Sequence, residues 1–135
     1  MVAVRLLDSN VCIEVLRGRN EALRQKLAAT NLADICLCSV VWAELYTGAN
    51  LSYDPQKSMR QLDAFRTLTS YPFDDDAARV YGELRASLQP RGQLIGGNDL
   101  MIAAIALARG LILVTNNTSE FSRIPGLKIE DWQTG

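Results

Sequence analysis

The sequence predicts a single α/β domain over residues 1–135, with a central, mostly parallel β-sheet flanked by helices. A chain of this length builds one hydrophobic core, and 48% of its residues are hydrophobic. Short apolar runs alternate with stretches of helical periodicity, which is the pattern of β-α-β units. Residues 111–115 form a continuous apolar run, typical of a strand covered on both faces of a parallel sheet.

The N-terminal part is expected to form one strand and two helices. Residues 2–7 are an apolar run rich in Val and Leu, which predicts a strand. Asp8 then offers a capping side chain for a helix that ends near Gly18. Two leucines spaced four residues apart predict a short helix over about residues 20–29.

The middle of the chain repeats this order. Residues 35–40 are expected to form a strand that leads into a helix near Trp42. Asp54 caps a further helix whose first position is Pro55. Apolar side chains recur at a spacing of three as far as Leu68, which predicts one amphipathic face along this helix.

The C-terminal half completes the alternation. Acidic residues 74–76 are expected to begin a helix that Pro90 ends, since negative charge favours a helix N-terminus. Asp99 is expected to cap an almost wholly apolar helix over residues 100–109. Strands are expected at residues 71–73, as a brief edge strand, and at residues 111–115 and 128–130.

The composition excludes several classes of catalyst. The chain contains no histidine, which removes Ser-His-Asp triads, His-ligated zinc proteases and imidazole acid/base relays. Any chemistry must therefore use carboxylates. A net charge of -1 gives no overall positive field for nucleic acid, so phosphate contacts would need local patches.

Cysteine usage favours a reducing compartment. Cys12, Cys36 and Cys38 are an odd number in apolar surroundings, and we expect free thiols in the core rather than a zinc site. With no recognisable leader and no apolar run long enough to span a bilayer, we expect a cytoplasmic protein that does not enter a membrane.

Five polar residues follow or flank the predicted strands. They are Asp8, Glu44, Asp99, Asn117 and Glu120. In an open α/β sheet the ligand site lies beyond the carboxyl ends of the strands, so this topology can bring them together. Converging carboxylates without His or Cys suit Mg²⁺ or Mn²⁺, and such an ion promotes hydrolysis of phosphate esters.

Each of these acids also has a purely structural explanation. Asp8 and Asp99 stand where Asp commonly caps a helix, and Glu44 could be a solvated helix position. Glu120 could follow the general preference for acids in a first helical turn. The acidic run 74–76 points in several directions along a helix, so it is interpreted as a helix start rather than a metal site.

Four stretches of the chain resemble the successive motifs of PIN-domain ribonucleases, most closely the VapC type of toxin. They are residues 6–13 (LLDSNVCI), 39–48 (SVVWAELYTG), 95–104 (IGGNDLMIAA) and 113–121 (LVTNNTSEF). The motifs occur in the family's order, and the tail at 124–132 (IPGLKIEDW) is similar to the same group. The resemblance covers nearly the whole chain and implies a PIN-like domain.

The resemblance also implies functional roles. Asp8, Glu44 and Asp99 would be the metal-binding acids, and Asn10, Asn98 and Thr115 would support the pocket. The implied cofactor is Mg²⁺ or Mn²⁺, and the implied activity is endonucleolytic cleavage of structured RNA such as tRNA. The implied partners are a cognate VapB-like antitoxin and a second copy of the chain in a homodimer.

Two positions depart from the family pattern. Ser9 replaces a frequent Thr and keeps the hydroxyl group. Asn117 stands where many PIN domains carry a fourth Asp, so a second metal ion would bind weakly or use Glu120. Arg17, Arg19 and Arg91 neighbour the motif-bearing segments and are candidates for contacts to RNA phosphates.

Two other functions of an acidic α/β pocket fit the sequence poorly, and a third is not excluded by composition. A phospho-receiver domain needs a Lys after a late strand, but Asn-Asn-Thr follows Thr115 here. A haloacid-dehalogenase-like phosphatase needs a second Asp two residues after the first, where this chain has Asn10. A PIN fold that has lost catalysis and only binds a partner protein is the third alternative.

Overall fold

A computed structural model describes residues 4–134 of the chain. A five-stranded sheet in the order β3-β2-β1-β4-β5 forms its centre, and each neighbouring pair of strands is parallel. The strands are β1 (Arg5–Leu7), β2 (Ile35–Cys38), β3 (Thr69–Tyr71), β4 (Ile112–Val114) and β5 (Ile129–Glu130). The predicted parallel α/β architecture is confirmed.

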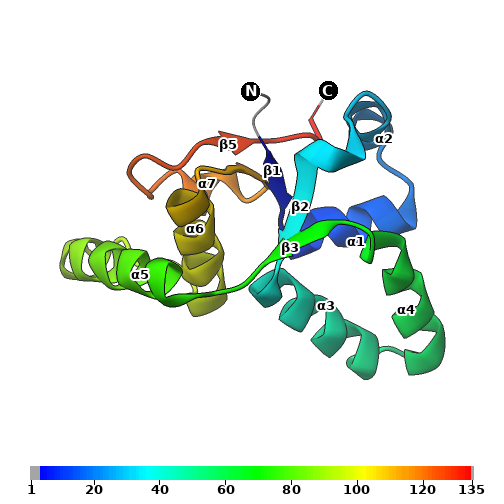
Figure 1. Ribbon diagram of the computed structural model, residues 1–135, viewed down its shortest axis with the longest axis horizontal. Helices are drawn as coiled ribbons and strands as arrows, with labels where there is room; N and C mark the ends of the chain where they lie inside the picture. The colour runs from blue at the N-terminus through cyan, green and yellow to red at the C-terminus, as the bar shows by residue number, and fades with distance from the viewer. Residues whose placement is uncertain (1–3, 135) are drawn as a thin grey trace.

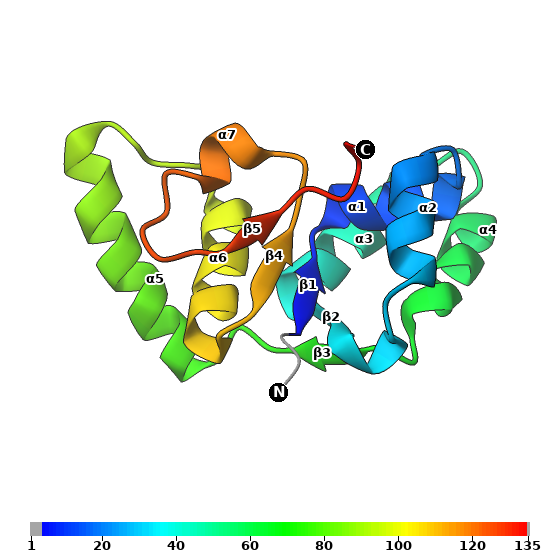
Figure 2. The ribbon, with the colours of Figure 1, turned by 90° about the horizontal axis from the view of Figure 1, so that it is seen from above.

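Seven α-helices and three short 3-10 helices connect these strands within the described residues. The α-helices are α1 (Ser9–Arg17), α2 (Glu21–Ala28), α3 (Ser39–Leu51), α4 (Pro55–Gln61), α5 (Asp75–Leu88), α6 (Gly97–Arg109) and α7 (Thr118–Phe121). The 3-10 helices are η1 (Leu32–Asp34), η2 (Leu62–Phe65) and η3 (Gln89–Arg91). Helices α5 and α6 lie on one side of the sheet, and α1, α2 and α4 lie on the other (Figure 1, Figure 2).

The core lies between these layers. The central strands β1, β2 and β4 contribute buried side chains, as the continuous apolar runs predicted. Helix α6 buries most of its length, from Leu100 to Ala106, because it packs on the sheet and against α5. Cys12, Cys36 and Cys38 are fully buried free thiols, which confirms their place in the core. Burial raises the pKa of Cys36 to about 12.

Several predicted boundaries shift. The first strand was expected at 2–7, but it begins at Arg5, and residues 2 and 3 lie outside the described part. The second strand ends at Cys38 rather than at residue 40. Val40 and Val41 belong instead to α3 and are both buried there, so core packing overrides their intrinsic preference for strands.

The helix expected to reach Leu68 ends earlier. Helix α4 stops at Gln61 and the chain continues as η2, because apolar side chains repeating every three residues match the three-residue turn of a 3-10 helix. The edge strand expected at 71–73 lies at Thr69–Tyr71. Pro72 follows it directly and has no backbone N–H to donate to a neighbouring strand.

Helix α6 corrects the expected role of Asp99. The helix begins at Gly97, and the amide of Leu100 donates to the carbonyl of Gly96 at 2.9 Å. Asp99 therefore lies inside the first turn and is not the cap. Asp8 does cap α1, and its Oδ1 accepts from the amides of Asn10 at 2.9 Å and Val11 at 3.2 Å. Across residues 4–134, every helix is too short or too polar to cross a bilayer.

Truncation of a core residue remote from the carboxylates tests this packing. Ile105→Ala should lower the free energy of unfolding by about 2–5 kcal/mol, because Ile105 is fully buried in α6. Leu51→Ala, at a side chain that is 82% exposed, should change it by less than about 0.5 kcal/mol. Urea denaturation of both variants measures the difference, and equal losses would contradict the described core.

Candidate active site

Asp8 is a nearly buried carboxylate at the carboxyl end of the central strand β1. Only 5% of the residue is exposed. Its Oδ1 caps α1, and its Oδ2 accepts a hydrogen bond from Thr115 Oγ1 at 2.6 Å. Burial raises the pKa of Asp8, while these hydrogen bonds oppose the rise because they favour the charged form. The residue is therefore a helix cap whose second carboxylate oxygen is held by Thr115.

Thr115 follows β4, the strand beside β1. Its backbone amide donates to the carbonyl of Glu130 at 3.0 Å, and its hydroxyl oxygen accepts from the amide of Asn117 at 3.0 Å. The hydroxyl proton is thereby directed at Asp8. Thr115 was expected to support the pocket. It is fully buried and fixes one oxygen of the Asp8 carboxylate, which agrees with that expectation.

Glu44 reaches the same region from α3. It is the sixth residue of that helix, which begins at Ser39. Glu44 Oε1 accepts a hydrogen bond from Ser9 Oγ at 3.0 Å. Since Ser9 directly follows Asp8, this contact ties Glu44 to the segment that carries the first acid. The sequence did not predict this hydrogen bond between Ser9 and Glu44, because neither the residue type nor the spacing of Ser9 indicates it.

Asp99 completes a cluster of like charges. Its pKa is raised to about 6, first by burial and then by the negative charges of Glu44, Asp8 and Glu120. Such repulsion requires Glu44, Asp8 and Glu120 each to lie within electrostatic range of Asp99. This agrees with the convergence expected from the parallel topology and adds Glu120 to it.

Asn117 and Glu120 form the remaining corner. Asn117 Nδ2 donates to Glu120 Oε2 at 3.1 Å, so the amide orients one acid rather than supplying another. Of the expected supporting residues, Asn10 contributes its backbone amide to Asp8, and Asn98 is exposed in the first turn of α6. Asn98 and Glu44 together line a cavity of about 360 Å³ between α3 and α6.

The donor set suits a hydrated divalent ion. Within residues 4–134, no three His, Cys, Asp or Glu side chains form a closely packed set of metal ligands. Mg²⁺ requires less, since it binds one or two carboxylates and keeps several of its waters. Burial is the first cause of the raised pKa of Asp99, and a cation between the acids would relieve the repulsion that adds to it.

The three candidate arginines lie in different places. Arg17 is exposed at the end of α1, where it pairs with Glu14 at 2.8 Å. It also lines a groove of about 420 Å³ together with Glu44. Arg19 is exposed in the connection between α1 and α2, and Arg91 is exposed at the end of η3. The structure brings only Arg17 to a cavity shared with an acid of the cluster.

Comparison with known proteins identifies the family of this chain. The model of the PIN domain family matches residues 5–127. The tRNA(fMet)-specific endonuclease VapC of Salmonella typhimurium is 38% identical over 128 residues, which cover 94% of this chain and 96% of that protein. Ribonuclease VapC2 of Rickettsia felis is 37% identical over 132 residues, which cover 96% of this chain and 98% of that protein.

Solved structures show the same fold. DNA-bound VapBC from Salmonella typhimurium matches with a TM-score of 0.90 and 36% identity, covering 97% of this chain and 99% of that chain. VapBC2 from Rickettsia felis, bound to a fragment of promoter DNA, matches with a TM-score of 0.87 and 36% identity, covering 96% and 98%. The chain therefore belongs to the PIN-domain family and, within it, to the VapC ribonucleases.

Proposed function

We propose that this chain is the toxin of a toxin–antitoxin pair and that it cleaves structured RNA by metal-dependent hydrolysis. The observation that carries the proposal is the position of Asp8 at the carboxyl end of β1, where Thr115 holds it and the adjacent Ser9 bonds to Glu44. The raised pKa of Asp99, caused by burial and then by the charges of the other acids, supports the same site. The relatives named as a tRNA(fMet)-specific endonuclease and as ribonucleases support RNA, and tRNA in particular, as the substrate class.

The residues of the site would have different roles in binding the metal ion and the water molecule. Asp8 and Asp99 would hold Mg²⁺ or Mn²⁺, and Glu44 would hold or orient a water molecule with Ser9 fixing its position. When bound, the ion supplies a water of lowered pKa and a Lewis acid for a phosphodiester oxygen. Glu120, oriented by Asn117, would complete the outer shell. In-line attack of water would leave a 5′-phosphate and a 3′-hydroxyl.

The partners follow from the same comparisons. The solved neighbours are VapBC complexes, which supports a VapB-like antitoxin as the cognate partner of this chain. A homodimer and a cytoplasmic location remain predictions from the family resemblance. Arg17 is the strongest candidate for a phosphate contact, because it lines the same groove as Glu44.

Neutral amides at the acids test the catalytic assignment. Asp8→Asn and Asp99→Asn should each lower the rate of RNA cleavage by at least about a hundredfold, since an amide keeps the shape and removes the charge that the ion needs. Gel analysis of purified protein with Mg²⁺ or Mn²⁺ measures the rate. Asp76→Asn, at an exposed acid in the first turn of α5, is the matched control and should cleave like wild type. Equal rates in all four proteins would defeat the assignment.

Titration calorimetry with a metal ion distinguishes a metal-dependent enzyme from a PIN domain that only binds a partner protein. Mn²⁺ titrated into antitoxin-free wild type should give saturable binding that Asp99→Asn weakens at least about tenfold, because one carboxylate ligand is lost. A flat titration in the wild type would instead support the catalytically inactive alternative.

The raised pKa of Asp99 also predicts how stability depends on pH. The pKa of about 6 in the folded protein lies above the ordinary value of 3.8 for an aspartate, so the folded protein binds the proton more tightly than the unfolded chain does. Without metal, wild type should gain stability relative to Asp99→Asn as the pH falls from about 7 to about 5. Scanning calorimetry of both proteins in the presence of a metal chelator measures this difference in stability. A constant difference across that range would show that Asp99 is not held among other charges.

Arginine substitutions test the phosphate contacts. Arg17→Gln should raise KM for RNA about two- to fivefold with little change in kcat, because a phosphate contact positions the substrate before and during the reaction. Arg91→Gln, remote from the groove shared with Glu44, is the comparison. A fall in kcat with unchanged KM for Arg17→Gln would assign that arginine another role.

A further inference from the structure

The last strand of the sheet supports the residue that holds Asp8. Strand β5 is only two residues long and lies at the edge of the sheet, beside β4. The carbonyl of Glu130 accepts from the amide of Thr115 at 3.0 Å, and Thr115 Oγ1 donates to Asp8 Oδ2 at 2.6 Å. The position of Asp8 thus depends, through Thr115, on a strand that is short enough to fray.

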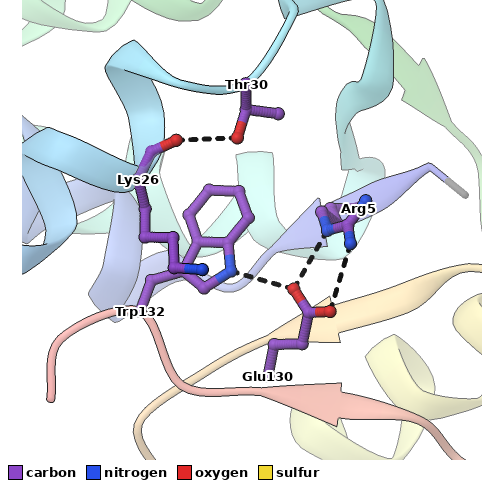
Figure 3. Close-up of polar contacts among 5 residues, drawn as sticks. All are labelled: Arg5, Lys26, Thr30, Glu130 and Trp132. Carbon is purple, nitrogen blue, oxygen red and sulfur yellow. Dashed lines mark hydrogen bonds and ion pairs between the residues drawn. The ribbon is translucent and has the colours of Figure 1, made fainter. Parts of the chain in front are cut away.

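A cluster of three side chains fastens this strand, and we name Arg5, Glu130 and Trp132 the C-terminal clamp. The guanidinium of Arg5 donates to both oxygens of Glu130, from Nε to Oε1 at 2.9 Å and from Nη2 to Oε2 at 3.2 Å. Trp132 Nε1 donates to the same Oε1 at 2.9 Å (Figure 3). Because β4 lies between β1 and β5, the ion pair spans the strand that leads to Thr115.

The residues after β5 are anchored as well. Trp132 is only 3% exposed, so its ring is packed into the fold. Asn20, at the start of α2, donates from Nδ2 to the carbonyl of Gln133 at 3.2 Å. The Arg5 contact lowers the pKa of Glu130, which keeps the carboxylate charged and able to accept these bonds near neutral pH.

We propose that the C-terminal clamp positions the Thr115–Asp8 pair for catalysis, a role that rests on the proposed nuclease function. Glu130 is the link, since its side chain belongs to the clamp and its backbone carbonyl holds Thr115. Loss of the clamp lets β5 detach more often, and Thr115 then loses the backbone hydrogen bond to Glu130 that fixes its position beside Asp8. Glu130 and Trp132 are positioning residues that do not contact the substrate.

The test uses one variant of unchanged side-chain size and one that keeps an aromatic ring. Glu130→Gln removes the charge and Trp132→Phe removes the indole donor. In both, exchange of the Thr115 amide proton should accelerate about fivefold, the size expected for a partly exposed ion pair. Under conditions where each variant is folded, kcat for RNA cleavage should fall about fivefold while KM stays the same. Hydrogen exchange is followed by NMR, and kinetics with Mg²⁺ or Mn²⁺ supplied.

Arg109→Gln is the matched control. The Arg109–Asp74 ion pair has similar exposure, 39% and 28% of the two side chains, against 24% and 35% for Arg5 and Glu130. It joins α6 to the start of α5, and its loss should leave Thr115 exchange and kcat unchanged.

Two results would overturn the proposal. Unchanged Thr115 exchange in both clamp variants would show that β5 stays in place without the clamp. Equal acceleration in Arg109→Gln would assign the effect to general destabilisation. A wild type that does not cleave RNA would defeat the nuclease function alone, because the exchange measurement still tests whether the clamp holds Thr115.

Discussion

The structure depends on keeping several negative charges together at one end of its sheet. Asp99 lies there within electrostatic range of Asp8, Glu44 and Glu120, and its pKa is raised first by burial and then by their negative charges. Placing charges so close costs free energy in the absence of a cation. The remaining contacts of the site are hydrogen bonds that hold the acids apart and in place: Thr115 and the start of α1 hold Asp8, Ser9 holds Glu44 and Asn117 holds Glu120.

The contacts of Asp8 show how one acid can be both a helix cap and a candidate metal ligand. Asp8 uses one oxygen to cap α1 and turns the other toward Thr115. The cap and the candidate metal ligand are therefore the same side chain, and the capping bonds favour the charged form that a metal requires. A helix cap at the end of a central strand is thus compatible with function and in this case prepares for it.

The fold and the acids could be predicted from sequence because they depend on local pattern. Apolar runs located the central strands, and the topology rule for parallel sheets selected Asp8, Glu44 and Asp99. The first turn of α6 was misjudged because Asp99 has the chemistry of a cap, whereas the chain uses glycine there. The contacts of Ser9 and Glu130 could not be predicted, since each joins segments distant in sequence through geometry that no periodicity encodes.

Asn117 supplies an amide at a position where many PIN domains carry a fourth Asp. An acid at this position would face Glu120, whose charge already contributes to the raised pKa of Asp99. It would increase the repulsion and could not donate to Glu120, whereas the amide donates a hydrogen bond and adds no charge. Glu120 is held in a defined orientation as a result. The departure from the common family pattern therefore replaces a fourth charge with control over the position of one already present.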